Sequence, residues 1–83
     1  MNNIPYHERE KGIKLNIGYY RRSRGISQEE LAERIDISRT HMSNLEAPKA
    51  SVGVTLDMLY RISHALDIDI AKLLDISKYS ELR

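Results

Sequence analysis

The chain of 83 residues contains no cysteine, tryptophan or phenylalanine, and it has only two prolines and four glycines. Without cysteine, neither a disulfide framework nor a thiolate metal site is available. No apolar run approaches the ~20 residues that a membrane-spanning helix requires, and charged residues occupy the N-terminus where a signal peptide would be apolar. We therefore expect a cytoplasmic protein with one small domain, which buries only about 60% of its unfolded surface.

Residues that usually carry catalysis or bind metals are few and scattered. His7, His41 and His64 fall in separate segments, and the sequence has no glycine-rich phosphate loop and no serine in a nucleophile-elbow setting. No histidine or carboxylate pair stands at ligand spacing with a third partner. We therefore predict that the chain is not an enzyme and binds neither a metal ion nor another cofactor.

The net charge of +1 does not by itself indicate a nucleic-acid partner, because many DNA-binding domains are more basic. The distribution of charge is slightly more informative. Residues 1–49 hold nine Lys or Arg against seven Asp or Glu, whereas residues 50–83 hold four against five. The small positive excess therefore lies in the first half of the chain.

The stretch ISQEELAERIDISRTHMSNLE, residues 26–46, begins with a strong helix-start signal. Ser27 can cap a helix, and Glu30, three residues later, would complete a capping box by reaching back to the Ser27 amide. The apolar pattern of this first helix stops at Asp36, a residue type that adopts left-handed backbone angles more readily than most. The sequence therefore predicts a short helix followed by a tight turn.

A second start signal follows at Ser38, and Met42 with Leu45 forms the inner stripe of a helix that must end before Pro48. The opposite face of this helix is polar. Its outward residues are Arg39, Thr40, Ser43 and Asn44. Two short helices joined by a tight turn, the second with a polar outer face, are typical of a helix-turn-helix.

This stretch closely resembles the helix-turn-helix of the phage repressor, Cro and Xre family. The residues that stand at the family's signature spacing are Gln28, Leu31, Ala32, Ser38, Leu45 and Glu46. The resemblance covers residues 13–74, which is most of the chain. It implies an all-α, compact five-helix domain of the lambda-repressor type. It also implies a transcriptional regulator, such as a repressor, that binds specific sequences in double-stranded DNA.

The beginning of the chain lacks a helical pattern. Residues 1–11 show no helical period, and Pro5 should break any early helix, so we expect a loosely held arm. A frayed terminus is favoured over an arm that touches DNA or a second subunit. From Gly12 the apolar spacing predicts a first helix that runs to about Arg24 and is closed by Gly25.

Residues 12–75 form the predicted helix-turn-helix domain, and residues 76–83 form a C-terminal tail. Thr55 can cap a fourth helix that ends at Asp67, and Asp69 can cap a short fifth helix. The predicted core comprises Ile13, Ile17, Tyr20, Ile26, Leu31, Ala32, Ile35, Ile37, Met42, Leu45, Leu56, Leu59, Ile62, Leu66, Ile68, Leu73 and Leu74.

By family position, the outward face of the helix at residues 39–46 enters the major groove and contacts bases. Arg39 has the donor fork to take guanine, and Thr40 offers a methyl group that suits thymine. Asn44 can pair with adenine, while Ser43 serves a base or a phosphate.

Five residues are predicted to contact DNA phosphates. Gln28, at the start of its helix, matches the family glutamine that contacts phosphate while bracing the reading helix. Ser38 combines helix capping with phosphate contact. A protonated His41 ring would contact a DNA phosphate at the wall of the groove. Lys49 and Ser51 lie in the following loop. For His41 and Lys49, a packed spacer and an ordinary exposed lysine remain open as alternatives.

Arg21 matches the family arginine that pairs with the glutamate at the end of the reading helix, here Glu46. Such a pair would tie the first helix to the third. Breaking a partly buried pair from one side is costly, so removing Arg21 should loosen the reading helix. Two solvated charges are the alternative.

One such module covers few base pairs, so a monomer would bind weakly. By resemblance we expect a homodimer on a two-fold operator whose half-sites lie roughly 34 Å apart. The predicted dimer contacts are the apolar residues Ile70, Leu73, Ile76, Tyr79 and Leu82 of the last helix and tail.

An alternative interpretation keeps the fold but replaces DNA with a protein partner. The chain would then be an antitoxin or a regulatory subunit that masks a toxin or RNA polymerase. The salt dependence of binding distinguishes the two interpretations. A complex with DNA phosphates weakens steeply as the salt concentration rises, whereas an apolar contact with a protein does not. Arg39 and Thr40 are also similar to the start of the reading helix in the controller proteins of restriction-modification systems. The sequence does not distinguish repression from activation.

Overall fold

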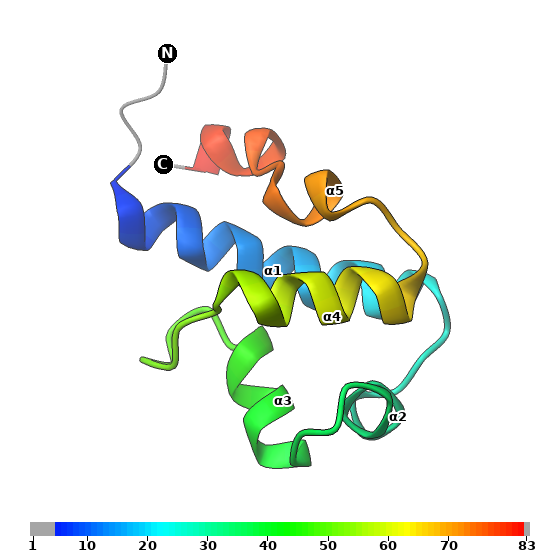
Figure 1. The fold of residues 1–83 in the computed structure, drawn as a ribbon. Coiled ribbons are helices and arrows are strands. Elements are labelled where there is room, and N and C mark those ends of the chain that lie inside the picture. Colours follow the sequence, from blue (N-terminus) through cyan, green and yellow to red (C-terminus); the bar gives the residue numbers. More distant parts are fainter. Residues whose placement is uncertain (1–4, 83) are drawn as a thin grey trace.

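The computed structural model describes residues 5–82, with side chains described for residues 5–79. Over this range the chain forms five α-helices and one 3-10 helix, and it contains no strand. The helices are α1 (Tyr6–Ser23), α2 (Gln28–Arg34), α3 (Arg39–Glu46), α4 (Leu56–Leu66), α5 (Ile70–Leu74) and η1 (Ser77–Leu82) (Figure 1). Within these residues, no helix has the length and apolar character needed to span a membrane. The all-α, five-helix fold expected from the sequence is confirmed.

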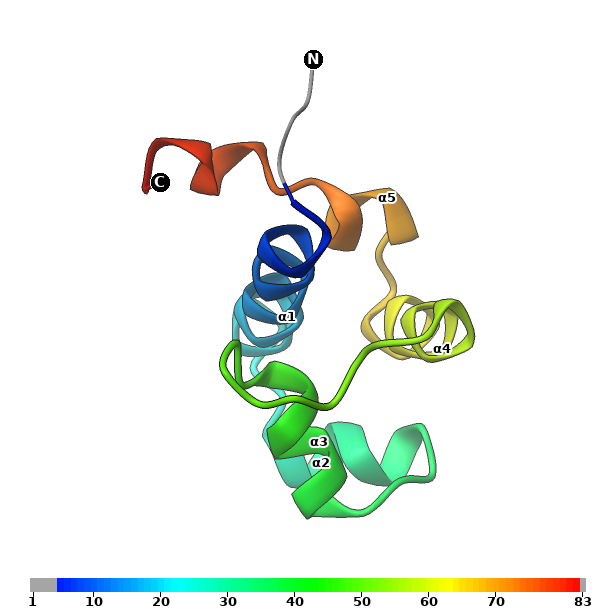
Figure 2. The same ribbon diagram turned by 90° about the vertical axis from the view of Figure 1, so that its left-hand side faces the viewer.

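Figure 2 looks along α1 and α4, which lie side by side. The pair α2 and α3 lies on one side of them, and α5 with η1 lies on the other. One hydrophobic core joins these layers. Its buried residues are Ile17, Ile26, Leu31, Ala32, Ile35, Met42, Leu45, Leu59, Ile62, Leu66 and Leu73. All of them belong to the core predicted from the sequence.

Two residues of the predicted core are exposed instead. Leu56 is 63% exposed and Leu74 is 44% exposed. Leu56 is the first residue of α4 and stands at the edge of its inner stripe. Leu74 follows the fully buried Leu73 at the end of α5, and its side chain points about 100° further around the helix axis, toward solvent. The prediction was therefore wrong for these two leucines.

The first helix begins at Tyr6, six residues before the predicted start at Gly12. Pro5 occupies the N-cap position with φ −59° and ψ 152°, and its carbonyl accepts hydrogen bonds from Glu8 and Arg9. Proline is compatible with a helix start, where the N–H that it lacks has no intrahelical partner. Pro5 therefore opens α1 rather than breaking it, and the loose arm expected over residues 5–11 is wrong. Residues 1–4 of that predicted arm lie outside the described residues.

The local start signals read from the sequence are confirmed. Four cap side chains each accept a hydrogen bond of 2.9–3.1 Å from a backbone N–H two or three residues later. They are Ser27, Ser38, Thr55 and Asp69. The second half of the capping box is replaced by an ion pair, because the Glu30 carboxylate accepts a 2.9 Å hydrogen bond from Arg34, one turn further along α2.

Among residues 5–82, three adopt positive φ, and each follows the end of a helix. Gly25 has φ +69°, Asp36 has φ +59° and Asp67 has φ +56°. Glycine reaches this region without steric penalty, and aspartate tolerates it better than most residues. The turn expected at Asp36 therefore closes α2 as the sequence indicated.

A buried amide fixes the C-terminal part of the chain to α1. Asn16 is fully buried, and its Nδ2 donates to the carbonyls of Leu73 at 2.9 Å and Asp75 at 3.0 Å. Its Oδ1 accepts a 3.1 Å hydrogen bond from the Tyr79 hydroxyl. The hydrogen bonds of this one side chain thus hold the end of α5 and the start of η1 against α1. Sequence patterning did not identify this polar residue as part of the interior.

The same packing corrects the predicted dimer surface. Leu73 is fully buried and Ile76 is nearly so, hence neither is free to contact a second subunit. Ile76 packs on Gly12, where an added Cβ would lie only 2.7 Å from Ile76 Cγ2. Ile70 and Tyr79 are half-buried. The side chain of Leu82 lies outside the described residues.

The positive φ of Asp67 gives a stability prediction. Replacing Asp67 with glycine should raise the free energy of unfolding by roughly 0.5–1 kcal/mol, because glycine adopts this conformation without strain. Urea denaturation measures the change. Asp57→Gly in the first turn of α4 is the matched control and should lower the free energy of unfolding by about 1 kcal/mol. An unchanged or lower stability for Asp67→Gly would show that Asp67 carries no strain.

Candidate nucleic-acid interface

Helix α3 presents a short polar face to solvent. Arg39, Thr40 and Ser43 are exposed, and Asn44 is half-buried beside them. The inner side of the helix is held by Met42 and Leu45, which are buried in the core. Figure 2 shows α3 crossing in front of α2, so its outward side is not covered by the other helices of the described chain. The outward orientation expected from the spacing is present for the first three residues.

The turn between α2 and α3 is fixed by backbone hydrogen bonds. The N–H of Ile37 donates to the Ala32 carbonyl at 3.0 Å, and the N–H of Asp36 donates to the Glu33 carbonyl at 3.2 Å. These bonds, with the positive φ of Asp36, reproduce the pattern that ends a helix through a left-handed residue. Because Ile35 is buried, the angle between the two helices is set by the backbone and the core together.

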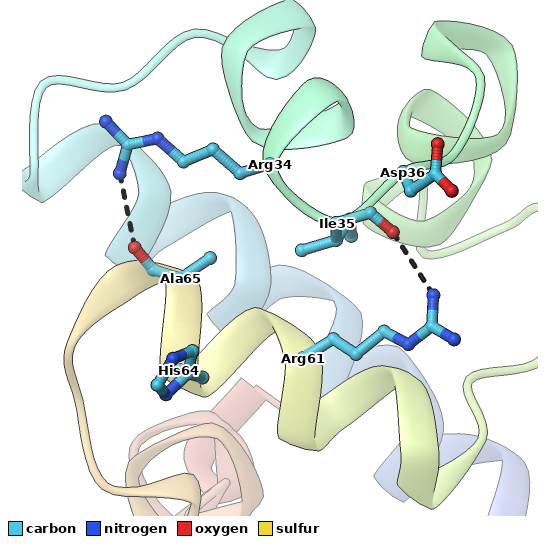
Figure 3. A pocket seen from close by; sticks show the side chains of 6 residues that line it. All are labelled: Arg34, Ile35, Asp36, Arg61, His64 and Ala65. Atoms are coloured by element: carbon cyan, nitrogen blue, oxygen red, sulfur yellow. Dashed lines mark hydrogen bonds between the residues drawn. The ribbon is translucent and has the colours of Figure 1, made fainter.

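Two arginines tie this unit to α4. Arg34 Nη1 donates to the Ala65 carbonyl at 3.3 Å, and Arg61 Nη1 donates to the Ile35 carbonyl at 3.2 Å (Figure 3). These arginines border a recess of about 540 Å³ between α2 and α4, which His64 also lines. Each arginine satisfies a carbonyl at the C-terminal end of the facing helix, where cations are favourable.

The end of α3 is tied to α1 by a buried ion pair. Arg21 Nε lies 2.5 Å from Glu46 Oε2, and Arg21 Nη2 lies 3.0 Å from Glu46 Oε1. Their side chains are only 10% and 7% exposed, and Arg21 Nη1 also donates to the Ile26 carbonyl at 2.8 Å. This two-pronged contact is the ion pair expected from the sequence, and it excludes two solvated charges.

Gln28 completes the contact from α2. Its Nε2 donates to Glu46 Oε1 at 3.0 Å, so the carboxylate receives hydrogen bonds from two different helices. Gly18 of α1 leaves the space that Glu46 occupies, because an added Cβ would lie 3.1 Å from Glu46 Oε1. This close approach accounts for a helix-interior glycine that the sequence alone does not explain.

Sequence reasoning missed a second connection between α1 and α3. Lys14 is only 1% exposed, and its ammonium donates to the carbonyls of Asn44 at 3.2 Å, Ala47 at 3.3 Å and Ala50 at 2.9 Å. It therefore caps the C-terminal end of α3 and holds the following loop. The one available signal is spacing, since Lys14 shares a helix face with the buried Ile17.

The residues predicted to contact phosphates occupy two places. Gln28 and Ser38 stand at the beginnings of α2 and α3, where the Ser38 hydroxyl oxygen accepts a 3.0 Å hydrogen bond from the N–H of His41. His41 is half-buried. Lys49 and Ser51 are exposed in the loop after α3. Their contacts with DNA, like those of the base-contacting residues, stay predictions.

The ion pair between Arg21 and Glu46 gives a second stability prediction. Arg21→Met should lower the free energy of unfolding by about 3 kcal/mol, because it leaves a buried carboxylate with Gln28 as its remaining side-chain donor. The double variant Arg21→Met/Glu46→Leu should recover most of that loss. Chemical denaturation of both variants measures the difference. If the double variant is no more stable than Arg21→Met, the loss does not arise from an unpaired carboxylate.

Comparison with known proteins agrees with this geometry. Residues 17–73 match the model of a family described as "Helix-turn-helix". The HTH-type transcriptional regulator SinR of Bacillus subtilis (strain 168) is 30% identical over 63 residues, which are 76% of this chain and 56% of SinR. The chain thus spans little more than half the length of that relative.

Solved structures give the same result. The crystal structure of SinR, the master regulator for biofilm formation, in complex with DNA has a TM-score of 0.68 at 30% identity, covering 76% of this chain and 98% of that chain. The clp gene regulator ClgR from C. glutamicum has a TM-score of 0.79 at 26% identity, covering 96% of this chain and 100% of that chain. A hypothetical transcription factor from Neisseria, NHTF, shares the fold with a TM-score of 0.73 at 22% identity, covering 99% of this chain and 93% of that chain.

The family match covers more than half of the chain and includes α2, the turn, α3 and the ion pair between Arg21 and Glu46. The chain therefore belongs to the helix-turn-helix family of the phage repressor, Cro and Xre type.

Proposed function

We propose that this protein is a transcriptional regulator that binds specific sequences in double-stranded DNA and reads the major groove with α3. The observation that carries the proposal is the polar face of α3, which is seated by Met42 and Leu45 and held at its end by Glu46. The relative SinR, at 30% identity, has been crystallised with DNA. Because the major groove admits an α-helix, an outward polar helix held on a rigid support is suited to reading base edges.

Base recognition is assigned to the outward side chains of α3. The exposed guanidinium of Arg39 has two parallel donors for guanine O6 and N7. Thr40 would place its methyl group against a thymine methyl, and the Asn44 amide would pair with adenine. Ser43 lies one turn after Arg39 and serves a base or a phosphate. None of these side chains contributes to the hydrophobic core, so they can differ between proteins without changing the fold.

Phosphate contacts are assigned to the starts of α2 and α3 and to the loop that follows α3. Gln28 is the first residue of α2, where free backbone N–H groups favour an anion, and Ser38 precedes the first turn of α3. Further phosphate contacts are assigned to His41 in α3 and to Lys49 and Ser51 in the loop that follows it. Contacts of this kind position the helix on the duplex, whereas the base contacts supply specificity.

We further propose that the protein binds a two-fold operator as a homodimer. A single α3 neutralises few phosphates and covers few base pairs, so two copies are needed for tight binding. The apolar surface that stays available on α5 and the tail consists of the half-buried Ile70 and Tyr79 and the exposed Leu74. These residues replace the buried Leu73 and Ile76 as the proposed contacts.

The readout assignment is tested first by selecting bound sequences from random duplex DNA, which reports the operator and its symmetry. On that operator, Arg39→Ala and Asn44→Ala should each weaken binding by about 1–3 kcal/mol and relax the preference for one base pair. Fluorescence anisotropy measures the affinities. Lys72→Ala, which removes an exposed lysine on α5, is the control and should leave base preference unchanged. Parent-like affinity of both α3 variants would refute the assignment.

The dimer is tested by sedimentation of the protein with and without Leu74→Glu. The charged side chain should shift the protein to monomers and weaken operator binding, because it places a carboxylate in the proposed apolar contact. Leu56→Glu, at an exposed leucine of α4, is the matched comparison. A parent-like dimer for Leu74→Glu, or dissociation by Leu56→Glu alone, would exclude the surface of α5.

A further inference from the structure

A basic recess lies next to the loop that follows α3, and the function proposed above leaves most of it unassigned. Its volume is about 360 Å³, and it separates the first turns of α1 from residues 48–51. Exposed residues come from both sides of the recess. His7 and Lys11 belong to α1, and Lys49 and Ser51 belong to the loop.

Positive charge predominates among the side chains that line this recess. Lys11, Lys14 and Lys49 face a single carboxylate, that of Glu10. The Glu10 carboxylate accepts a 3.2 Å hydrogen bond from the N–H of Val54, so it serves to hold the end of the loop. The Lys11 ammonium lies 3.7 Å from the carboxylate of the half-buried Glu8, a surface pair of a kind that contributes little and is readily exchanged.

Lys14 adds a charge that does not depend on surface side chains. The three oxygens that its ammonium contacts are backbone carbonyls, which are neutral. They satisfy its donors but leave its full positive charge in place. Because this charge is buried, water screens it less than it screens an exposed lysine, and its field extends into the recess. The recess is thus favourable for an anion.

The position of the recess relative to α3 identifies the anion. Figure 1 shows the start of α1 and the loop after α3 on the same side of the molecule, the side that faces the viewer in Figure 2. The loop leaves α3 directly at its C-terminal end, where the chain must pass out of a groove occupied by that helix. The walls of the groove are phosphate backbones, so a basic recess at this point is placed where a helix reading the groove would bring a phosphate.

We propose that this recess binds a phosphate of the DNA backbone beside the half-site read by α3, with Lys11 and Lys49 as its charged ligands. Ser51 and His7 supply further hydrogen-bonding groups, and Lys14 supplies the buried charge. The proposal rests on the function proposed above and deepens it, because it makes the first turns of α1 a third DNA-contacting segment. Lysine suits such a site since it binds phosphate as a point charge without demanding one geometry.

The test is the salt dependence of binding to duplex DNA, measured by fluorescence anisotropy for Lys11→Gln and Lys49→Gln. Each substitution removes one phosphate contact per subunit, so for a dimer on its operator the magnitude of the slope of log K against log salt should fall by about two. Binding should weaken equally on selected and random duplexes. Lys72→Gln removes the same charge from α5, away from the recess, and its slope should equal that of the parent. Thermal unfolding of all three variants verifies that each is folded.

The outcomes separate this site from the proposed function. Parent-like slopes for Lys11→Gln and Lys49→Gln would refute the phosphate site in the recess. This holds even where Arg39→Ala abolishes sequence preference and so supports the assignment of α3 as the reading helix. An equal drop for Lys72→Gln also overturns the phosphate site, because the effect would then be one of net charge. Titration with inorganic phosphate, followed by the amide resonances of residues 11 and 49, detects a free-anion site. Binding of that probe with unchanged DNA slopes would likewise overturn the DNA assignment.

Discussion

The carboxylate of Glu46 is the point at which the helix-turn-helix is joined to the rest of the molecule. It accepts hydrogen bonds from Arg21 of α1 and Gln28 of α2, and the glycine at position 18 gives it room. A buried charge is tolerated only when it is paired and hydrogen-bonded, so this carboxylate cannot leave its donors without a large penalty. The end of α3 is therefore fixed relative to two other helices at once.

Helix α1 acts as the scaffold to which the other segments are attached. Lys14 holds the end of α3 and the loop after it, Arg21 holds Glu46, and Asn16 holds α5 and η1. All three are buried polar side chains on one helix, and no buried side-chain nitrogen or oxygen in the described part of the chain lacks a hydrogen-bond partner. A small domain has little apolar surface to bury, and such contacts add directional constraints that apolar packing does not provide.

This arrangement has a direct consequence for recognition. A helix that reads base edges must keep its side chains in register with the groove. The residues that support the helix must therefore stay in place when DNA phosphates are bound near its ends. In this protein α3 is fixed at its start by the backbone of the turn, beneath by the core, and at its end by Glu46 and Lys14. Its outward residues take no part in these contacts through their side chains. The support and the reading surface are thus separate sets of residues.

The sequence by itself determined the local features of the protein. The caps at Ser27 and Ser38, the left-handed turn at Asp36 and the apolar stripe through Met42 and Leu45 depend on residues within one or two turns of each other. Such short-range preferences can be read without knowing the fold. The family resemblance added the pairing of Arg21 with Glu46, which spacing alone does not reveal.

Only the tertiary structure decided which polar side chains are internal and where the tail goes. Lys14 and Asn16 lie 30 and 57 residues from the carbonyls of Asn44 and Leu73 that they contact, so no local pattern marks them as buried. The burial of Ile76 was missed because it depends on packing against Gly12, which is distant in the chain. The start of α1 was missed because Pro5 was interpreted as a helix breaker, whereas it occupies the N-cap position. Long-range proximity is a property of the assembled helices and has no short-range signature in the sequence.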